Sequence, residues 1–145
     1  MYKVRTEQEL LDEQLTPHFK RSEFACKCGG KYCNPRYMNP DPRLVDMCEV
    51  IREYVDTPIR ISSGCRCNTW NKQQGGVDSS AHCYGFAADL HCSIGSEKLY
   101  KAIQELYNQG KLPFLCYCQR YISKDFCHLD CDVNKKRNNK FATVK

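Results

Sequence analysis

The sequence predicts an α+β fold in which helices pack against a small antiparallel sheet. Two patterns predict it: apolar residues three and four positions apart in the helical segments, and alternating apolar and polar residues in short runs. The chain has 145 residues, which is enough for one domain with a sizeable core but leaves little room for a second. We therefore expect residues 1–145 to form a single domain.

Three helices are predicted. The first covers residues 41–55, where apolar side chains share one face, and a short one covers residues 68–74 before two glycines. The third begins with Ser96 as its N-cap and ends before Gly110. Its apolar face consists of Leu99, Ala102, Ile103 and Leu106.

Four strands are predicted between and after these helices. The runs TPIRISSG (residues 57–64) and AADLHC (residues 87–92) are short and apolar on one face. The runs FLCYCQRYI (residues 114–122) and FCHLDCDV (residues 126–133) alternate clearly. The turn at residues 123–124 separates the last two, so we expect them to form a hairpin.

Charge and hydropathy exclude several function classes. The formal net charge of +5 is mild, and part of it lies in a basic tail at residues 134–145. A solvated terminus explains this tail better than a nucleic-acid partner does. No apolar run approaches the roughly eighteen residues of a membrane span, so no membrane insertion is expected. The N-terminus lacks the apolar region of a secretory signal, so we expect synthesis in the cytoplasm.

Twelve cysteines are unusual in a chain without an export signal. In a reducing compartment such thiols favour metal binding or burial over disulfides. Six of them form C-x-C pairs, in which the two side chains would share one face of a strand. The pairs are Cys26 with Cys28, Cys65 with Cys67, and Cys116 with Cys118. Two readings stay open: a structural metal or disulfide cluster, and buried free thiols.

Two histidines and an aspartate suggest a separate metal site. His82, Asp89 and His128 all lie in small or apolar stretches, where polar side chains are otherwise unexpected. Imidazole nitrogen and carboxylate oxygen are zinc ligands, and a catalytic zinc site uses three protein ligands with a fourth position open. The alternative is that each histidine is an ordinary buried core residue.

At these residues the sequence resembles the zinc D-Ala-D-Ala carboxypeptidase and hedgehog-type metallopeptidase family. SSAHCYGFAAD matches its S-x-H-x-x-G-x-A-x-D signature, and ISSGCRCNTWNKQQGG is similar to its upstream S-G-[YC]-R…N…GG block. FCHLDCDV resembles its last ligand strand, and LTPHFKRSEFACKCGG resembles the opening of phage-type members. The likeness covers about residues 15–133, and it implies a hedgehog- or DD-peptidase-like fold.

The resemblance implies a zinc peptidase with the metal on His82, Asp89 and His128. Arg66 matches the family arginine that faces the substrate, where a guanidinium suits a carboxylate or a developing oxyanion. The matched Ser80 and Asn71 are expected to bind substrate or support the ligands. Asp130 shares a strand face with His128 and is expected to orient a ligand.

Asp125 is the predicted general base, because many relatives place an acidic residue three positions before the last zinc histidine. Asp130 is the fallback, and a solvated turn aspartate is the alternative. His91 shares a face with Asp89 and either lines the cleft or lies in solvent.

The resemblance also implies that the N-terminal cysteines lie near the later C-x-C pair, since the two blocks occur together in relatives. The expected cluster comprises Cys26, Cys28, Cys33, Cys65 and Cys67, as disulfides or as a second, structural metal site.

The expected function is hydrolysis of peptidoglycan stem peptides, as a D-Ala-D-Ala carboxypeptidase or an L-Ala-D-Glu endopeptidase. A phage endolysin or a virion-borne wall-cutting enzyme is expected, with phage structural proteins as further partners. Such an enzyme would reach the wall after release or as part of the particle. The alternative is a non-catalytic zinc-containing domain that uses the same fold for binding.

Overall fold

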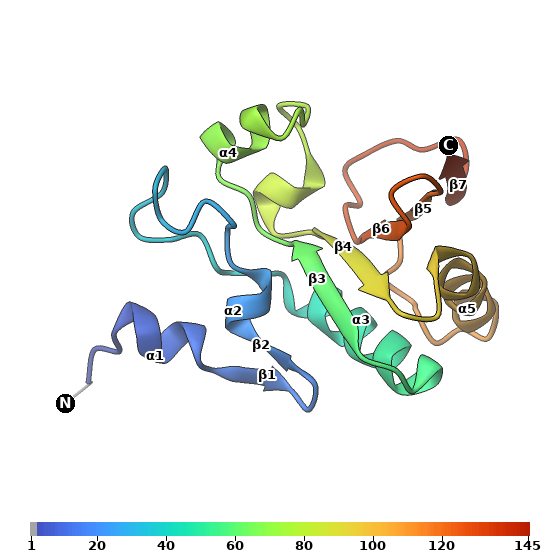
Figure 1. Ribbon diagram of the computed structural model, residues 1–145, viewed down its shortest axis with the longest axis horizontal. Helices are drawn as coiled ribbons and strands as arrows, with labels where there is room; N and C mark the ends of the chain where they lie inside the picture. The colour runs from blue at the N-terminus through green and yellow to red at the C-terminus, as the bar shows by residue number, and fades with distance from the viewer. Residues whose placement is uncertain (1–2) are drawn as a thin grey trace.

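The computed structural model describes residues 3–145 and confirms an α+β fold (Figure 1). Its main sheet has five strands in the order β3-β4-β6-β5-β7. Neighbouring strands are antiparallel, except that β7 runs parallel to β5, so the sheet is mixed. The strands are β3 (Ile59–Ser63), β4 (Ala87–Cys92), β5 (Tyr117–Tyr121), β6 (Phe126–Asp130) and β7 (Phe141–Val144). The first four are the strands that the sequence predicts, including the β5–β6 hairpin.

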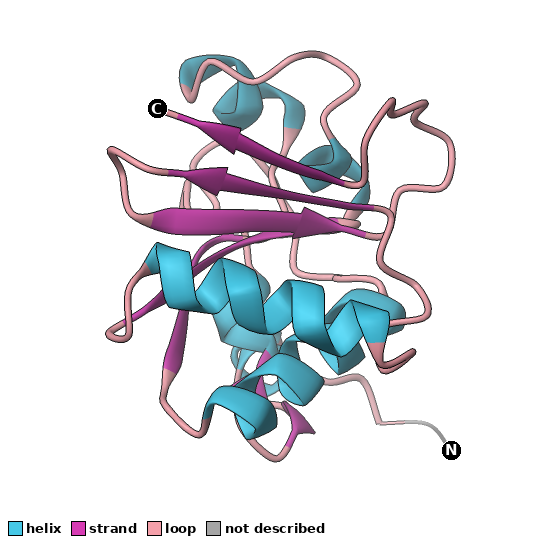
Figure 2. Ribbon diagram, turned by 90° about the vertical axis from the view of Figure 1, so that its right-hand side faces the viewer, coloured by secondary structure: helices cyan, strands magenta, loops and turns pink. Residues whose placement is uncertain are grey.

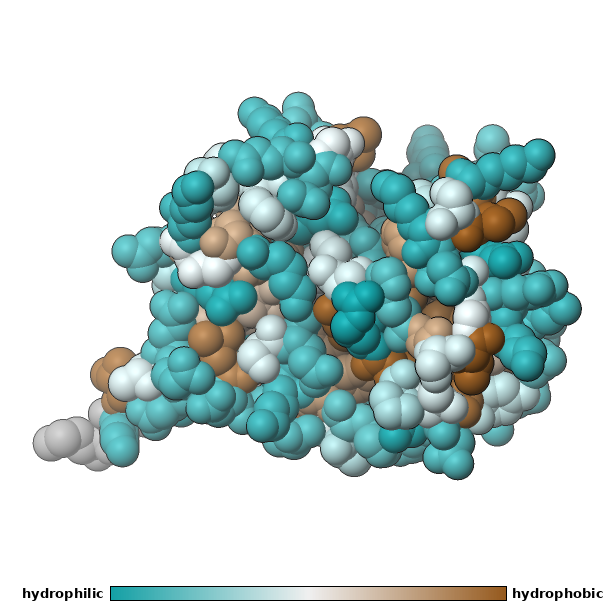
Figure 3. Space-filling model, viewed as in Figure 1, coloured by the Kyte–Doolittle hydropathy of each residue, from teal (hydrophilic) through white to brown (hydrophobic). Residues whose placement is uncertain are grey.

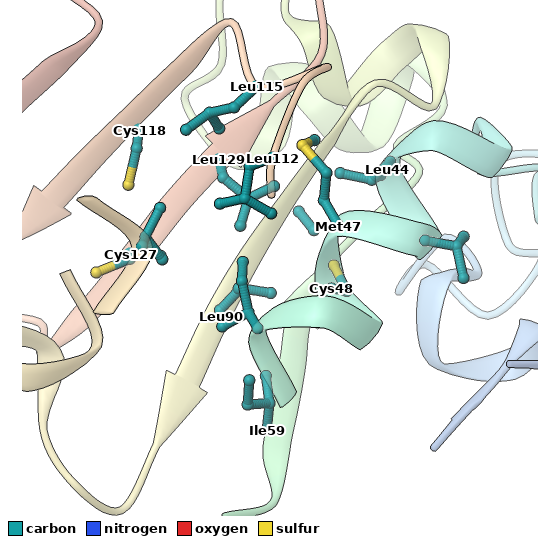
Figure 4. Packing of buried hydrophobic residues seen from close by; sticks show 14 of the residues in the cluster. Leu44, Met47, Cys48, Ile59, Leu90, Leu112, Leu115, Cys118, Cys127 and Leu129 are labelled. Atoms are coloured by element: carbon teal, nitrogen blue, oxygen red, sulfur yellow. The ribbon is translucent and has the colours of Figure 1, made fainter. Parts of the chain in front are cut away.

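Two long helices cover one face of this sheet. They are α3 (Pro42–Val55) and α5 (Ser96–Asn108), and Figure 2 shows α5 running alongside the strands. Leu90 of β4 and Leu129 of β6 point into the same core as Leu44 and Met47 of α3 (Figure 4). Each fully buried leucine of this kind contributes about 1.5–3 kcal/mol. The opposite face of β4 and β6 is thereby left for polar side chains.

The start of α5 differs from the prediction. Gly95, with φ of 90°, is the N-cap, and Ser96 is already the first helical residue. The Ser96 amide donates a hydrogen bond of 2.8 Å to the Asp125 carboxylate, which comes from the β5–β6 hairpin. Serine is a frequent local N-cap, but here a side chain distant in sequence satisfies the helix terminus.

The N-terminal region contributes four elements that the sequence patterns do not predict. They are α1 (Glu7–Leu11), β1 (Gln14–Thr16), β2 (Phe19–Lys20) and α2 (Arg21–Phe24), with β1 and β2 forming a small antiparallel sheet. Phe19 and Phe24 are buried in the main core. Figure 1 shows β3 running from the end of α3 towards α4 (Asn68–Gln73), the predicted short helix. A 3-10 turn, η1 (Ala81–Tyr84), then leads into β4.

The basic tail is more ordered than predicted. Strand β7 lies within it, and two of its cations contact the body of the protein. Arg137 lies 4.2 Å over the Tyr117 ring and donates to Asp130, while Lys140 donates to the Leu115 carbonyl. Residues 134–145 are therefore part of the fold rather than a freely solvated terminus.

The surface is mostly hydrophilic on the face seen in Figure 3, with hydrophobic side chains only in small spots. In the part of the chain that the structure describes, no helix combines the length and hydrophobicity needed to cross a membrane.

Gly64 marks a close approach of two backbones that should tolerate no side chain. A Cβ atom at this position would lie 2.8 Å from both the Cα and the carbonyl oxygen of Phe24. The neighbouring Cys65 amide also donates to that Phe24 oxygen, at 2.9 Å. We expect Gly64→Ala to lower the free energy of unfolding by about 1–3 kcal/mol, because α2 must shift. Denaturant unfolding measures this, with Ser123→Ala on an exposed turn as the control. An unchanged midpoint for Gly64→Ala would contradict the described packing.

Candidate metal centre

The pairing of β4 with β6 brings together the three predicted ligands. Asp89 lies directly opposite His128 in the register, and His82 reaches the same point from η1. The His82 Nε2 atom lies 3.3 Å from Asp89 Oδ1, and His128 Nδ1 lies 3.1 Å from the same oxygen. All three candidate ligand atoms lie within 4.8 Å of one another. Two imidazoles and a carboxylate are a donor set that suits zinc.

Each histidine is oriented by a hydrogen bond at the ring nitrogen that does not face Asp89. His82 Nδ1 lies 2.7 Å from the Gly64 carbonyl, which can only accept, so this nitrogen carries the proton and Nε2 is free to bind metal. His128 Nε2 lies 2.9 Å from Asp130 Oδ2, which leaves Nδ1 for the metal. Carbonyl and carboxylate partners of this kind are typical of metal-binding histidines. The geometry therefore fits a metal ion.

Asp130 is fully buried and is itself held in place. Arg137 Nη2 donates to its Oδ2 atom at 2.9 Å, and the Asp132 amide donates to its Oδ1 atom at 3.2 Å. It lies beside His128, where the sequence predicts it.

The buried carboxylates at this site shift the protonation of the histidines beside them. Burial raises the pKa of Asp89, but hydrogen bonds with His128 and His82 outweigh this and hold it below its usual range. Burial lowers the pKa of His82. Burial also lowers the pKa of His128, but the bonds to Asp130 and Asp89 prevail and raise it to about 9. Without metal, a proton on His128 offsets the neighbouring carboxylates, and a metal ion would have to displace it.

Arg66 lies beside the ligands and is fixed by polar neighbours. Its Nε donates to Ser63 Oγ at 2.9 Å, its Nη1 to Asn71 Oδ1 at 3.3 Å and its Nη2 to Asp89 Oδ2 at 3.5 Å. Asn71 is buried and is anchored by a bond from its Nδ2 to the Val77 carbonyl. Ser80 accepts from the His82 amide at the start of η1. The structure thus brings Arg66 and Ser80 to the ligands, whereas Asn71 reaches them only through Arg66.

The ligands line one cavity of about 260 Å³. Its remaining lining residues are Arg66, Gln74, Gly75, Gly76, Ser80, Tyr121, Lys124 and Phe126. Tyr121 stacks on Phe126 with ring centroids 4.5 Å apart. No motif in the sequence marks Tyr121 or Lys124 as a lining residue, although strand alternation places Tyr121 on the face opposite to the buried Cys118. Lys124 carries no such signal, because it lies in a turn.

Asp125 is not where the prediction of a general base requires it. Its φ is 54°, and its carboxylate accepts from the Ser96 amide at the start of α5. That hydrogen bond lowers the pKa of Asp125, so it is ionised. Asp125 lines a different cavity, together with Arg60 and His91. In the described arrangement the Asp125 carboxylate therefore does not line the ligand cavity, although the residues on both sides of it do, and its role as general base stays a prediction.

His91 also lies outside the ligand cavity. Its Nε2 lies 2.8 Å from Ser62 Oγ, and its ring stacks on Phe126 at 5.2 Å. Neither alternative for His91 describes it fully: it does not line the metal cleft, and it is half-buried rather than fully solvated.

Four of the five expected cluster cysteines come together. Their sulfur atoms lie within 4.8 Å of one another, and the residues are Cys26, Cys28, Cys33 and Cys67. Cys65 does not join them: it is buried beside Tyr37, because the chain turns into α4 at Cys67 and the two side chains diverge. Cys118 and Cys127 are free thiols of the core, as the alternative reading predicts.

Comparison with known proteins identifies one family. A family model described as Peptidase M15 matches residues 17–130. No curated protein matches the sequence. The matched range contains the three candidate ligands, Arg66, Asp130 and the four clustered cysteines.

Asp130 offers a test of this metal centre. Asp130→Asn should weaken zinc binding by about 10- to 100-fold, because the amide cannot supply the negative charge that supports His128. Competition with a chromophoric chelator measures the affinity, and the His82→Ala variant reports zinc held elsewhere in the chain.

Asp132→Asn is the matched control. Asp132 is equally buried, but its carboxylate accepts from the Asn134 amide and contacts none of the three candidate ligands. Equal zinc affinity in the two variants would contradict the role given to Asp130.

Proposed function

The chain belongs to the peptidase M15 family of zinc-dependent metallopeptidases, and we propose that its substrates are the stem peptides of peptidoglycan. The observation that carries the proposal is the convergence of His82, Asp89, His128 and Arg66 on one cavity. A cation next to a metal centre suits a peptide substrate that carries free carboxylates. Stem peptides carry them at the terminal D-Ala and at D-Glu.

The three ligands would hold the zinc ion. His82 would bind through Nε2 and His128 through Nδ1, because their other ring nitrogens are already bonded. When bound, zinc supplies a Lewis acid that polarises the scissile carbonyl and activates water. The protein itself fixes the two imidazoles and keeps the Asp89 carboxylate ionised.

Arg66 would bind the negative charge of the substrate. Its three hydrogen bonds hold the guanidinium beside Asp89, so little ordering is needed when substrate arrives. Charge-assisted hydrogen bonds from a guanidinium are strong for a carboxylate and for an oxyanion that develops during the reaction. Lys124 adds a second cationic side chain to the same cavity.

Asp125 remains our proposed general base, despite its bond to α5. The ligand cavity contains no other carboxylate than Asp89 among the residues that line it, and Asp89 is a ligand. Asp125 lies between two lining residues, Lys124 and Phe126, and it is exposed and ionised. To accept a proton at the cavity, its side chain would have to leave the Ser96 amide.

We further propose that the protein acts as a phage endolysin or as a virion-borne wall-cutting enzyme. The likeness of residues 15–30 to phage-type members supports this assignment. Both D-Ala-D-Ala carboxypeptidase and L-Ala-D-Glu endopeptidase activity agree with the cavity. The second candidate function is a non-catalytic zinc-containing domain, which the bond between Asp125 and α5 favours.

Digestion of purified peptidoglycan tests the proposal. The zinc-loaded protein should release products whose masses identify the bond, either single alanine or peptides cut after L-Ala. A chelator should abolish release, added zinc should restore it, and His82→Ala should be inactive. Intact peptidoglycan after incubation with the zinc-loaded protein would favour the non-catalytic alternative.

The Asp125→Asn variant distinguishes two roles of Asp125, general-base catalysis and capping of α5. Asparagine caps a helix about as well as aspartate, so fold and zinc content should be kept. Loss of the proton acceptor should lower kcat by about a hundredfold to ten-thousandfold. Asp125→Ala is the comparison variant, because alanine cannot cap α5. Its thermal unfolding midpoint should therefore fall. Near-normal turnover of Asp125→Asn would leave this residue with the capping role only.

A further inference from the structure

The four clustered cysteines form a site that the proposed chemistry does not use. Cys26, Cys28 and Cys33 come from the loop between α2 and α3, and Cys67 is the N-cap of α4. All four are free thiols, and their sulfur atoms lie within 4.8 Å of one another. The site therefore joins two segments that lie more than thirty residues apart in sequence.

The backbone folds so that the sulfurs converge. Gly29 and Gly30 have φ of 69° and 89°, which lets the chain turn sharply after Cys28. Amide hydrogen bonds from Gly29 to the Cys26 carbonyl and from Lys31 to the Cys28 carbonyl close this turn. Residues 26–33 thus form a compact sulfur-bearing loop.

Backbone amides point at two of the sulfurs. The Cys67 amide lies 3.4 Å from Cys26 Sγ, and the Tyr37 amide lies 3.4 Å from Cys33 Sγ. Sulfur is a weak acceptor as a neutral thiol and a better one as a thiolate. Several thiolates this close together would repel one another unless a cation neutralised them.

The sulfur spacing agrees with one metal ion at the centre. Tetrahedral zinc with four sulfur ligands at about 2.3 Å requires sulfur atoms about 3.8 Å apart. Cys28 Sγ and Cys33 Sγ are 3.5 Å apart, and all four sulfurs lie within the limit of 4.8 Å, so small side-chain rotations suffice. Four thiolates closing a tetrahedron are characteristic of structural zinc, because no position is left for water or substrate.

We propose that Cys26, Cys28, Cys33 and Cys67 bind one structural zinc ion that ties the loop between α2 and α3 to the start of α4. Cys67 directly follows Arg66, and α4 carries Asn71, which accepts from Arg66. The ion therefore fixes the segment that presents Arg66 to the ligand cavity. This last consequence rests on the proposed function, whereas the binding site itself does not.

The His82→Ala protein isolates this second site, because the first loses a ligand while every cysteine is kept. Elemental analysis should find about one zinc per chain in it, and zinc-edge X-ray absorption should show four sulfur ligands at about 2.3 Å. Cobalt in place of zinc should give the intense near-ultraviolet absorption of thiolate ligation. A metal-free His82→Ala protein, or zinc bound by nitrogen and oxygen only, would overturn the proposal. A Cys28–Cys33 disulfide in the freshly isolated protein would overturn it too.

Cysteine variants and hydrogen exchange locate the site. Cys28→Ser with Cys33→Ser, made in the His82→Ala protein, should abolish the bound zinc, whereas Cys116→Ser outside the cluster should keep it. Removing the ion from the His82→Ala protein, in which every cysteine is kept, should speed amide exchange in residues 26–37 and 65–73. Exchange in β5 and β6 should stay unchanged. Equal exchange with and without metal would contradict the structural role, whatever the protein does to peptidoglycan.

Discussion

The antiparallel register of β4 against β6 is the constraint on which the metal centre depends. It sets Asp89 opposite His128, while Leu90 and Leu129 point to the other face and fill the core. Because side chains alternate along a strand, a slip of one residue would turn the ligand side chains towards the helices and the leucines towards the metal cavity. The packing of α3 and α5 therefore fixes the position of the ligands, although neither helix provides one.

Hydrogen bonds to the ligand side chains orient them for metal binding. The Gly64 carbonyl and the Asp130 carboxylate select which ring nitrogen of each histidine faces Asp89. Arg137, from the basic tail, neutralises Asp130 in turn. Buried carboxylates are costly without such partners, so the tail strand β7 and the ligands are parts of one electrostatic arrangement.

Sequence patterns predicted those helices and strands whose signal lies in residues close together in the chain. The apolar periodicity of α3 and the alternation of β5 and β6 can each be recognised within a few neighbouring residues. The ligand set could be identified because His82, Asp89 and His128 are polar side chains in otherwise apolar stretches. Their likeness to family motifs pointed to the same three residues.

The features that the sequence did not reveal depend on partners distant in the chain. Asp125 caps α5 through Ser96, and no pattern around either residue indicates that contact. Strand β7 is short, follows a basic run and joins the sheet by pairing with the distant strand β5. Cys65 leaves the sulfur cluster because the chain turns at Cys67, which a C-x-C spacing alone cannot show.

Anomalous diffraction at the zinc edge, from crystals of the zinc-loaded protein, tests the central claim most directly. The predicted result is a zinc peak bounded by His82 Nε2, Asp89 and His128 Nδ1, with the Gly64 and Asp130 contacts still in place. Ligation through His82 Nδ1 or His128 Nε2 would contradict the account, as would a zinc-loaded crystal with no peak between β4 and β6.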